Sequence, residues 1–319
     1  MEEIKSNRRI LLGFIKSACE ELGLKYEEFS QEWIIKISST QKSTYIFGYS
    51  FQLNPQSSSR ICKDKAATTT ILNSFKIPNI QHNIFRSFKN SGAEDGNWEE
   101  ILDFLKKNKK IVIKPNEGMG GKGVAVIDNK SDLESLVYKN IKERTAFTLS
   151  PFINIITEYR VVILNGIVKL IHKKIIPELT GDDSKTILQL LVDQFDIIPN
   201  AVIQYINKSE LKWNYIPKNN EKVKINWKHN LSEGADIDMN INEDLKRKIS
   251  KIALKVAEVL GMKFTSIDIV ENMNNELLVI EVNSGVTLAN FALKGEKEYV
   301  IVKNIYKEAV ELMMNKNEI

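Results

Sequence analysis

Three long segments repeat their apolar residues at the spacing of an α-helix. The periodicity predicts helices over about 243–260, before Gly261, and over about 297–314. A third helix is expected over residues 3–22, with Gly23 as its cap. Its repeated apolar positions are Ile10, Leu11, Phe14, Ile15, Ala18 and Leu22.

Shorter β-branched and aromatic runs predict strands at 33–37 and 44–47. The segment Asn54-Pro55-Gln56-Ser57-Ser58-Ser59 is interpreted as a linker. A helix is expected from Lys65 to Phe75, and Ile77-Pro78 ends it. After it the chain alternates between strand and helix. The expected elements are strands near 80–88, at 111–114 and at 124–127, a helix near 97–107, and a helix to about Lys142 that starts with a Ser131/Glu134 capping box.

A hairpin is predicted where residues 158–164 and 167–171 flank Asn165-Gly166, because Asn-Gly between two apolar runs favours a two-residue turn. The stretch 177–240 is polar and irregular, and one helix is expected in it, at 186–195.

A glycine-rich loop, Lys114-Pro115-Asn116-Glu117-Gly118-Met119-Gly120-Gly121-Lys122-Gly123, connects two predicted strands. Closely spaced glycines let backbone N–H groups approach an anion, so the loop is a candidate phosphate cradle. A dinucleotide fingerprint would need a helix after the loop, and a Walker A loop would need Lys-Ser/Thr after its second glycine. A protein kinase would also need the H-R-D and D-F-G motifs, which are missing. A glycine-rich hairpin without a ligand remains the alternative.

A second hairpin carries acidic residues, with strands at 264–270 and 276–283 and a turn at 271–275. We expect residue 268 to lie opposite 279. This register places Asp268, Val279, Glu281 and Asn283 on one face and the isoleucines on the other. The two acids would be diagonal neighbours roughly 7 Å apart. They would repel each other by roughly 2 kcal/mol, and a divalent cation between them would turn this repulsion into a net attraction. A solvated acidic face is the alternative.

Composition narrows the class of protein. The 319 residues are 43% hydrophobic and 27% charged, with a formal net charge of +4, as in an ordinary globular protein. Cys19 and Cys62 are too few for a disulfide framework, which favours a reducing, cytoplasmic location. We find no apolar signal region, no run of about 18 apolar residues and no dense basic block, so neither membrane nor nucleic acid is expected as a partner.

In their order along the chain, the glycine loop, Glu158-Tyr159-Arg160-Val161-Val162-Ile163-Leu164-Asn165-Gly166 and the acidic hairpin resemble the ATP-grasp superfamily. The chain is most similar to the branch of cyanophycin synthetase and glutathione synthetase-type ligases. Pro177-Glu178-Leu179-Thr180-Gly181-Asp182-Asp183 and His229-Asn230-Leu231-Ser232-Glu233-Gly234 resemble two further segments of that branch.

The resemblance implies an α+β (α/β) ATP-grasp fold in three parts. These are a small N-terminal α/β domain at 1–60, a central lid subdomain at 61–148, and a C-terminal antiparallel-sheet subdomain with the metal site at 149–319. The implied activity is ATP-dependent ligation of a carboxylate to an amine through an acyl phosphate, releasing ADP and phosphate. The implied substrates are small molecules or peptides, and a homo-oligomer such as a dimer is left open. A small-molecule kinase on the same fold and a non-catalytic ATP-binding module are the alternatives.

The resemblance also implies roles for single residues. The phosphates of ATP would meet Lys65, Lys114 and the loop glycines Gly118, Gly120, Gly121 and Gly123. Adenine would meet the backbone at Ser150, Phe152 and Ile153, where the family usually has an acidic residue, and the ribose would meet Glu158. One or two Mg²⁺ ions, with Mn²⁺ as a substitute, would be held by Asp268, Glu281 and Asn283. The catalytic residues would be Arg160, on phosphate or acyl phosphate, Asn230, and Lys174, with either Lys173 or Lys174 in place of a family arginine. The carboxylate substrate's end would be lined by Asn230, Ser232 and the Ser284-Gly285 turn, which replaces the usual Pro-Gly.

Overall fold

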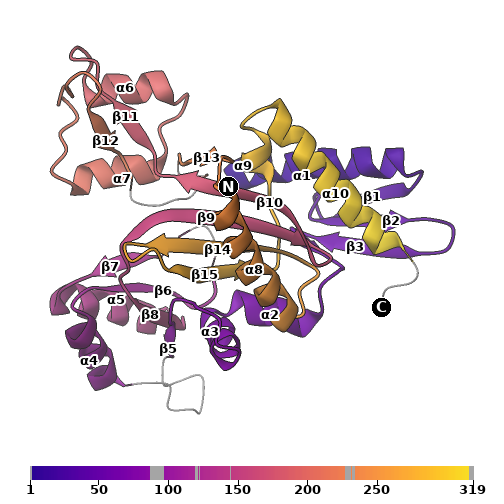
Figure 1. The fold of residues 1–319 in the computed structure, drawn as a ribbon, viewed down its shortest axis with the longest axis horizontal. Coiled ribbons are helices and arrows are strands. Elements are labelled where there is room, and N and C mark those ends of the chain that lie inside the picture. Colours follow the sequence, from indigo (N-terminus) through magenta and orange to yellow (C-terminus); the bar gives the residue numbers. More distant parts are fainter. Residues whose placement is uncertain are drawn as a thin grey trace. The chain divides into compact units, whose positions relative to one another are not determined.

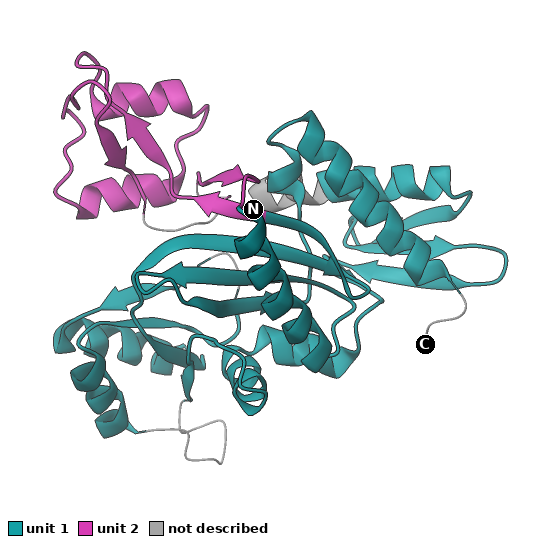
Figure 2. Cartoon of the chain, viewed as in Figure 1, with its two compact units in different colours: residues 1–171, 242–319 teal, residues 172–241 magenta. Residues whose placement is uncertain are grey.

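The computed structural model describes residues 2–86, 97–118, 121, 123–143, 145–226, 231 and 234–315. The chain forms two compact units, residues 1–171 with 242–319 and residues 172–241 (Figure 2). This division follows compactness and does not test the predicted boundaries at 60 and 148, which stay a prediction. Among the described helices, none combines the length and the apolar character that a membrane crossing requires.

The N-terminal part of the first unit is a four-stranded antiparallel sheet packed with helices. Its elements are α1 (Glu2–Glu21), β1 (Lys25–Phe29), β2 (Ile34–Ser38), β3 (Ser43–Phe47) and β4 (Ser50–Phe51), with the strands in sequential order. Ile35, Ile37 and Ile46 are fully buried. Helix α1 packs on the last helix, α10 (Glu296–Met314) (Figure 1). The predicted helices at 3–22 and 297–314 are therefore confirmed.

The linker predicted at 54–59 is wrong, because helix α2 (Gln56–Lys63) occupies most of it. Pro55 stands at the N-cap with φ −58°, where a missing N–H costs nothing, so the proline starts a helix here. The buried Cys62 anchors its inner face. Helix α3 (Lys65–Ser74) follows as predicted, with the Asp64 side chain accepting from the N–H of Ala67.

The central part is a second antiparallel sheet with two helices. Its elements are β5 (Asn83–Phe85), α4 (Trp98–Asn108), β6 (Ile111–Pro115), β7 (Ala125–Ile127), α5 (Lys130–Lys142) and β8 (Phe147–Pro151), with strand order β5-β8-β6-β7. All were expected except β8. The capping box at Ser131 is wrong, because the cap of α5 is Asn129, whose side chain accepts from the N–H of Asp132. Asn129 has the extended backbone that a cap needs, whereas Ser131 already lies in the first turn.

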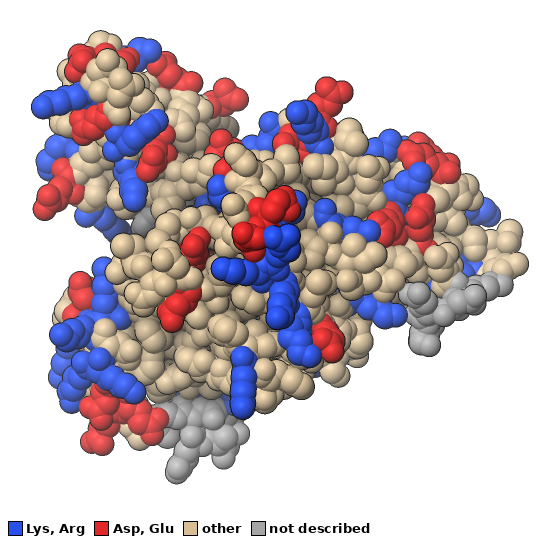
Figure 3. Space-filling view, in the orientation of Figure 1, with Lys and Arg blue, Asp and Glu red and all other residues tan. Residues whose placement is uncertain are grey.

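The largest sheet of the first unit has the order β10-β9-β14-β15. Its strands are β9 (Ile155–Leu164), β10 (Ile167–Ile175), β14 (Phe264–Asn272) and β15 (Leu277–Asn283). Asn165 and Gly166 both have positive φ, as the predicted Asn-Gly turn requires. Helix α8 (Glu243–Val259) packs on β9 and β14, and the short α9 (Ala289–Ala292) follows the sheet. Lys and Arg side chains form a column over α8, so its outer face is the solvated side of an amphipathic helix (Figure 3).

The second unit has its own hydrophobic core, which was not expected from its polar sequence. Leu179, Val202, Ile206, Val223 and Ile225 pack together in it. Its elements are β11 (Glu178–Thr180), α6 (Ile187–Gln194), α7 (Asn200–Lys208), β12 (Lys222–Lys224) and β13 (Asp236–Asp238). The helix expected at 186–195 is confirmed, with a capping box at Thr186. The expectation that the rest of the stretch is irregular is wrong for the described residues of β11, α7, β12 and β13, because a few apolar residues far apart in sequence suffice for this small core.

Candidate functional site

Asp268 and Glu281 lie directly opposite each other on the paired strands β14 and β15. The predicted register, with residue 279 opposite 268, is wrong. A β-bulge leaves Ile280 unpaired, so that Val279 lies opposite Ile269. The two acids still share a face. Their separation is that of a direct cross-strand pair rather than a diagonal one, so their repulsion is stronger than expected.

Two features outside the hairpin's alternating pattern explain the bulge. The Asn272 side chain accepts from the N–H groups of Asn274 and Glu276 and so tightens the turn. Val279 bonds through its backbone to Pro78 and Ile80, about 200 residues earlier in the chain, at 3.0 and 2.9 Å. These contacts fix Val279 on the buried side, and the strand must add one residue before Glu281 returns to the acidic face.

Arg160 neutralises Asp268. It lies opposite Asp268 on β9, and its Nε and Nη2 donate to the two carboxylate oxygens at 2.9 and 2.8 Å. The Asp268 side chain is only 4% exposed, so this pair is largely removed from water. Burial alone would lower the pKa of Arg160, but the Asp268 carboxylate raises it above its usual value. The structure thus contains the ion pair, and a phosphate contact by Arg160 stays a prediction.

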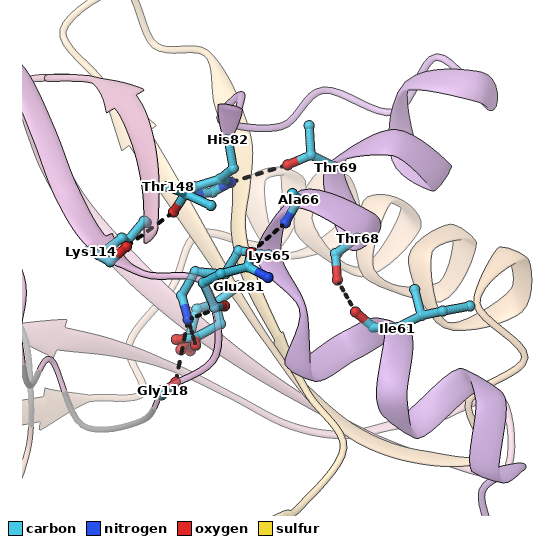
Figure 4. A network of polar contacts seen from close by, with 12 residues as sticks. Ile61, Lys65, Ala66, Thr68, Thr69, His82, Lys114, Gly118, Thr148 and Glu281 are labelled. Carbon is cyan, nitrogen blue, oxygen red and sulfur yellow. Dashed lines mark hydrogen bonds and ion pairs between the residues drawn. The ribbon is translucent and has the colours of Figure 1, made fainter. Parts of the chain in front are cut away.

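Lys65 links Glu281 to the glycine loop. Its Nζ lies 3.7 Å from Glu281 Oε1 and donates to the carbonyls of Asn116 and Gly118 at 3.3 Å each (Figure 4). Burial, with the negative charge of Asp268, raises the pKa of Glu281, while the nearby Lys65, Lys114 and Arg160 oppose that shift. The fold therefore holds a carboxylate that lacks full charge compensation.

Lys114, at the end of β6, is only 8% exposed. Burial lowers its pKa to about 8, and the positive charge of Lys65 acts in the same direction, while Glu281 and Glu158 oppose it. Two partly desolvated lysines thus lie close enough to affect each other, as expected where an anion is to be bound.

Asn116 is a site residue that the sequence analysis missed. It is almost fully buried, its side chain accepts from the N–H of Ala66 at 3.2 Å, and its carbonyl accepts from the N–H of Lys65. Its own N–H donates to Ala146. It therefore ties the start of α3 to the glycine loop. The one signal in the sequence was an asparagine directly after a strand.

His82 also faces this region. Its Nδ1 lies 3.1 Å from the Thr69 hydroxyl, and burial lowers the pKa of the ring to about 2, so it is neutral. A narrow pocket is lined by His82, Lys65, Glu281, Asn79 and Thr69, among others. Among the described residues, none offers a hydrogen-bond partner to the buried Nε2 of His82.

Within the glycine loop, Gly118, Gly121 and Gly123 are described, and Gly120 lies outside the described residues. Gly121 and Gly123 have positive φ, at 67° and 73°. A Cβ on Gly123 would also come within 2.9 Å of the Pro115 ring. The turn thus requires glycine at 123 for two independent reasons.

The residues expected to meet adenine lie at the end of β8 and directly after it. Ser150 is buried opposite Val112, and the N–H of Phe152 donates to the backbone carbonyl of Lys110. The Lys110 ammonium lies 4.2 Å from the centre of the Phe152 ring, and Ile153 is the next residue. Glu158 lies on the same face of β9 as Arg160, two residues away. Their contacts with a nucleotide stay predictions.

The remaining predicted residues divide in two groups. Lys174 is buried in the second unit, opposite Ile237, and its neighbour Lys173 pairs with Asp238 at 2.9 Å. Asn230 and Ser232 lie outside the described residues. Among the residues that are described, no three His, Cys, Asp or Glu side chains gather as a metal cluster. The candidate metal set is therefore two carboxylates with the amide of Asn283.

Two family models match the chain. Residues 83–189 match the ATP-grasp domain of prokaryotic glutathione synthetase, and residues 219–305 match the RimK-like ATP-grasp domain. The glycine loop and Arg160 fall in the first range, and the acidic hairpin falls in the second.

Similar proteins agree with these models. The glutathione biosynthesis bifunctional protein GshAB of Listeria innocua is 22% identical over 298 residues, covering 84% of this chain and 35% of that protein. The same protein of Clostridium perfringens is 22% identical over 296 residues, covering 83% and 35%. The chain thus spans about a third of the length of these relatives.

Solved structures share the fold. A bifunctional glutathione synthetase from Pasteurella multocida has a TM-score of 0.58 at 15% identity, covering 92% of this chain and 44% of that one. The D-alanine–D-alanine ligase from Bacillus anthracis has a TM-score of 0.53 at 16% identity, covering 82% and 71%. These likenesses confirm the expected ATP-grasp fold. Both family models describe ATP-grasp domains, so the comparisons agree with the expected ATP-grasp superfamily and with its glutathione synthetase-like branch.

Proposed function

We propose that this protein is an ATP-dependent carboxylate–amine ligase that releases ADP and phosphate. The observation that carries the proposal is the position of Lys65, whose ammonium contacts both the glycine loop and Glu281 on the acidic hairpin. The candidate phosphate cradle and the pair of carboxylates therefore meet at Lys65, which supports a site for phosphoryl transfer. Neither the empty glycine hairpin nor the solvated acidic face accounts for this meeting.

The nucleotide would lie with its phosphates against Lys65, Lys114 and the loop glycines. Both lysines are largely buried, so each would gain more from a phosphate than an exposed lysine would. Ser150, Phe152 and Ile153 would present backbone groups to the adenine, and Glu158 would reach the ribose. These roles are proposals by family likeness, supported by the placement of Glu158 on the Arg160 face of β9.

The acidic residues suit Mg²⁺. Asp268, Glu281 and Asn283 all offer oxygen atoms, the ligands that Mg²⁺ prefers. The raised pKa of Glu281 indicates a carboxylate that would gain from a further positive charge. When bound, Mg²⁺ would neutralise the phosphates and the two acids. Asp268 would have to share its oxygens between Arg160 and the ion.

The proposed reaction has two steps. A substrate carboxylate oxygen attacks the γ-phosphorus, the bond to the bridging oxygen of ADP breaks, and an acyl phosphate forms. An amine nitrogen then attacks the acyl carbon, phosphate leaves, and the amine loses a proton. The chain's residues would position the groups and balance charge, with no covalent intermediate on the protein. Arg160 is proposed to contact the phosphate or the acyl phosphate, and Asn230 and Lys174 are proposed as further catalytic residues.

The two cysteines also bear on the proposal. Cys19 and Cys62 are both free thiols and both buried, which supports a reducing, cytoplasmic setting. The substrates would be small-molecule or peptide carboxylates and amines.

A substrate screen tests the proposal. Amino acids, including D-alanine, and short peptides are offered in pairs with ATP and Mg²⁺, and ADP and phosphate are measured separately. A ligase releases both in equal amounts and only when acid and amine are present. ADP without free phosphate would instead support a kinase, and no turnover with bound ATP would support a non-catalytic module.

A further inference from the structure

The segment that begins at the last residue of β15, residues 283–288, is held by side chains from three other parts of the first unit. The Thr265 hydroxyl donates to the carbonyl of Asn283 at 2.9 Å. The amide of Asn54 donates to the carbonyl of Ser284 at 3.4 Å. The Tyr306 hydroxyl donates to the carbonyl of Val286 at 3.1 Å and accepts from the N–H of Leu288 at 3.0 Å.

Asn54 makes four hydrogen bonds with its side chain alone. Besides Ser284, its Nδ2 donates to the carbonyl of Phe264 at 2.6 Å. Its Oδ1 accepts from the N–H groups of Lys263 and Phe264 at 2.9 and 2.8 Å. It therefore joins the beginning of β14 to the residue after Asn283 and replaces the ladder bonds missing at that end of the hairpin.

Tyr306 completes this support from α10. Its ring is buried and stacks on Phe51 of β4, with ring centres 5.7 Å apart and planes 4° from parallel. Phe51 lies three residues before Asn54, so the N-terminal sheet and α10 form one support. Asn54 and Tyr306 both lie outside the ranges that the family models match, 83–189 and 219–305.

We propose that Asn54 and Tyr306 are positioning residues that fix the backbone of 283–288 and thereby aim Asn283 at the bound metal–nucleotide complex. This inference rests on the proposed function. In this inference, the N-terminal region helps to shape the proposed metal and nucleotide site and is not a functionally separate domain. Substituting a residue that orients a metal ligand without touching the metal typically lowers metal affinity by about 10- to 100-fold.

Two variants test the inference, with a matched control. Asn54→Asp keeps the acceptor for Lys263 and Phe264 but sets a carboxylate against the two carbonyls. Tyr306→Phe removes only the hydroxyl, and it keeps the test open if the first variant folds poorly. The control is Gln52→Ala, because within the described part of the chain the Gln52 side chain accepts only from the Thr44 hydroxyl and the Tyr45 N–H, both in the N-terminal sheet.

The readouts are melting temperature and calorimetric binding of ATP with and without Mg²⁺, well below the melting temperature. We expect Asn54→Asp and Tyr306→Phe to weaken Mg²⁺-dependent binding by about 10-fold. Metal-free ATP binding, which depends on the lysines, should stay as in the wild type, and Gln52→Ala should change neither. Unchanged Mg²⁺-dependent binding in both folded variants would overturn the inference, whatever their melting temperatures. A wild type that binds no Mg²⁺–ATP would contradict the proposed function itself.

Discussion

Arg160 and Asp268 face each other across β9 and β14 and form a two-pronged ion pair, with N–O distances of 2.9 and 2.8 Å. The pair resolves a conflict in the sequence. Glu281, on the next strand, lies opposite Asp268, and two adjacent carboxylates repel each other unless nearby cations offset their charge. Arg160 provides that cation for Asp268, and Lys65 provides it in part for Glu281.

Removing one partner of the pair should destabilise the fold strongly. In Asp268→Asn, Arg160 would lose its counter-charge inside the sheet. We expect a loss of about 3–5 kcal/mol in the free energy of unfolding, measured by urea denaturation. Asp193→Asn is the control, since its ion pair with Lys185 is exposed and should contribute less than about 1 kcal/mol. Equal losses in both variants would show that burial of the Arg160 pair has no special weight.

The glycine loop should tolerate no side chain at residue 123. Gly123→Ala would suffer both the positive φ of 73° and a contact of 2.9 Å with Pro115. Gly166→Ala has nearly the same φ, 74°, but nothing within 4 Å of the added Cβ. Each substitution should lower the free energy of unfolding by about 1–2 kcal/mol, because alanine is strained at a positive φ. Only Gly123→Ala should also weaken ATP binding, and similar ATP affinities in the two variants would contradict this role.

ATP affinity should depend on pH through Lys114. Burial lowers the pKa of Lys114 to about 8 in the free protein, and bound phosphates would raise it. Below this pKa the lysine is already charged, so affinity is constant. Above it, binding must take up a proton, and affinity falls as pH rises. Titrations from about pH 7 to pH 9.5 should show the fall in the wild type and lose it in Lys114→Met, which should bind more weakly throughout. If Lys114→Met showed the same decline of ATP affinity with rising pH, the decline would come from another ionisable group.

Glu281→Gln should separate ion binding from stability. Because burial and Asp268 raise the pKa of Glu281, its charged form is unfavourable in the fold. The contribution of Glu281 to the free energy of unfolding therefore increases as pH falls through the raised pKa. Replacing Glu281 with Gln should remove this pH dependence without lowering the melting temperature near neutral pH. Mg²⁺–ATP binding should weaken. Glu258→Gln, on the exposed face of α8, is the control. Normal Mg²⁺ dependence in Glu281→Gln would make the acids a solvated face after all.

Local patterns predicted most of the elements and the face shared by Asp268 and Glu281, because alternation and helical spacing are local properties. The bulge at Ile280 could not be predicted, since it depends on backbone bonds from Pro78 and Ile80 to Val279. Asn116 and Asn54 were missed for the same reason, because their partners lie far away in sequence. Helix α2 was missed because Pro55 was interpreted as a linker residue when it starts a helix.

The central claim is that a carboxylate is activated as an acyl phosphate. The most direct measurement follows oxygen from an ¹⁸O-labelled substrate acid that, with an amine, stimulates ADP release. If the γ-phosphoryl group passes to the carboxylate, the phosphate released must carry one ¹⁸O atom, and mass spectrometry should find it in proportion to the amide formed. Phosphate without label, or AMP and pyrophosphate in place of ADP and phosphate, would contradict the account.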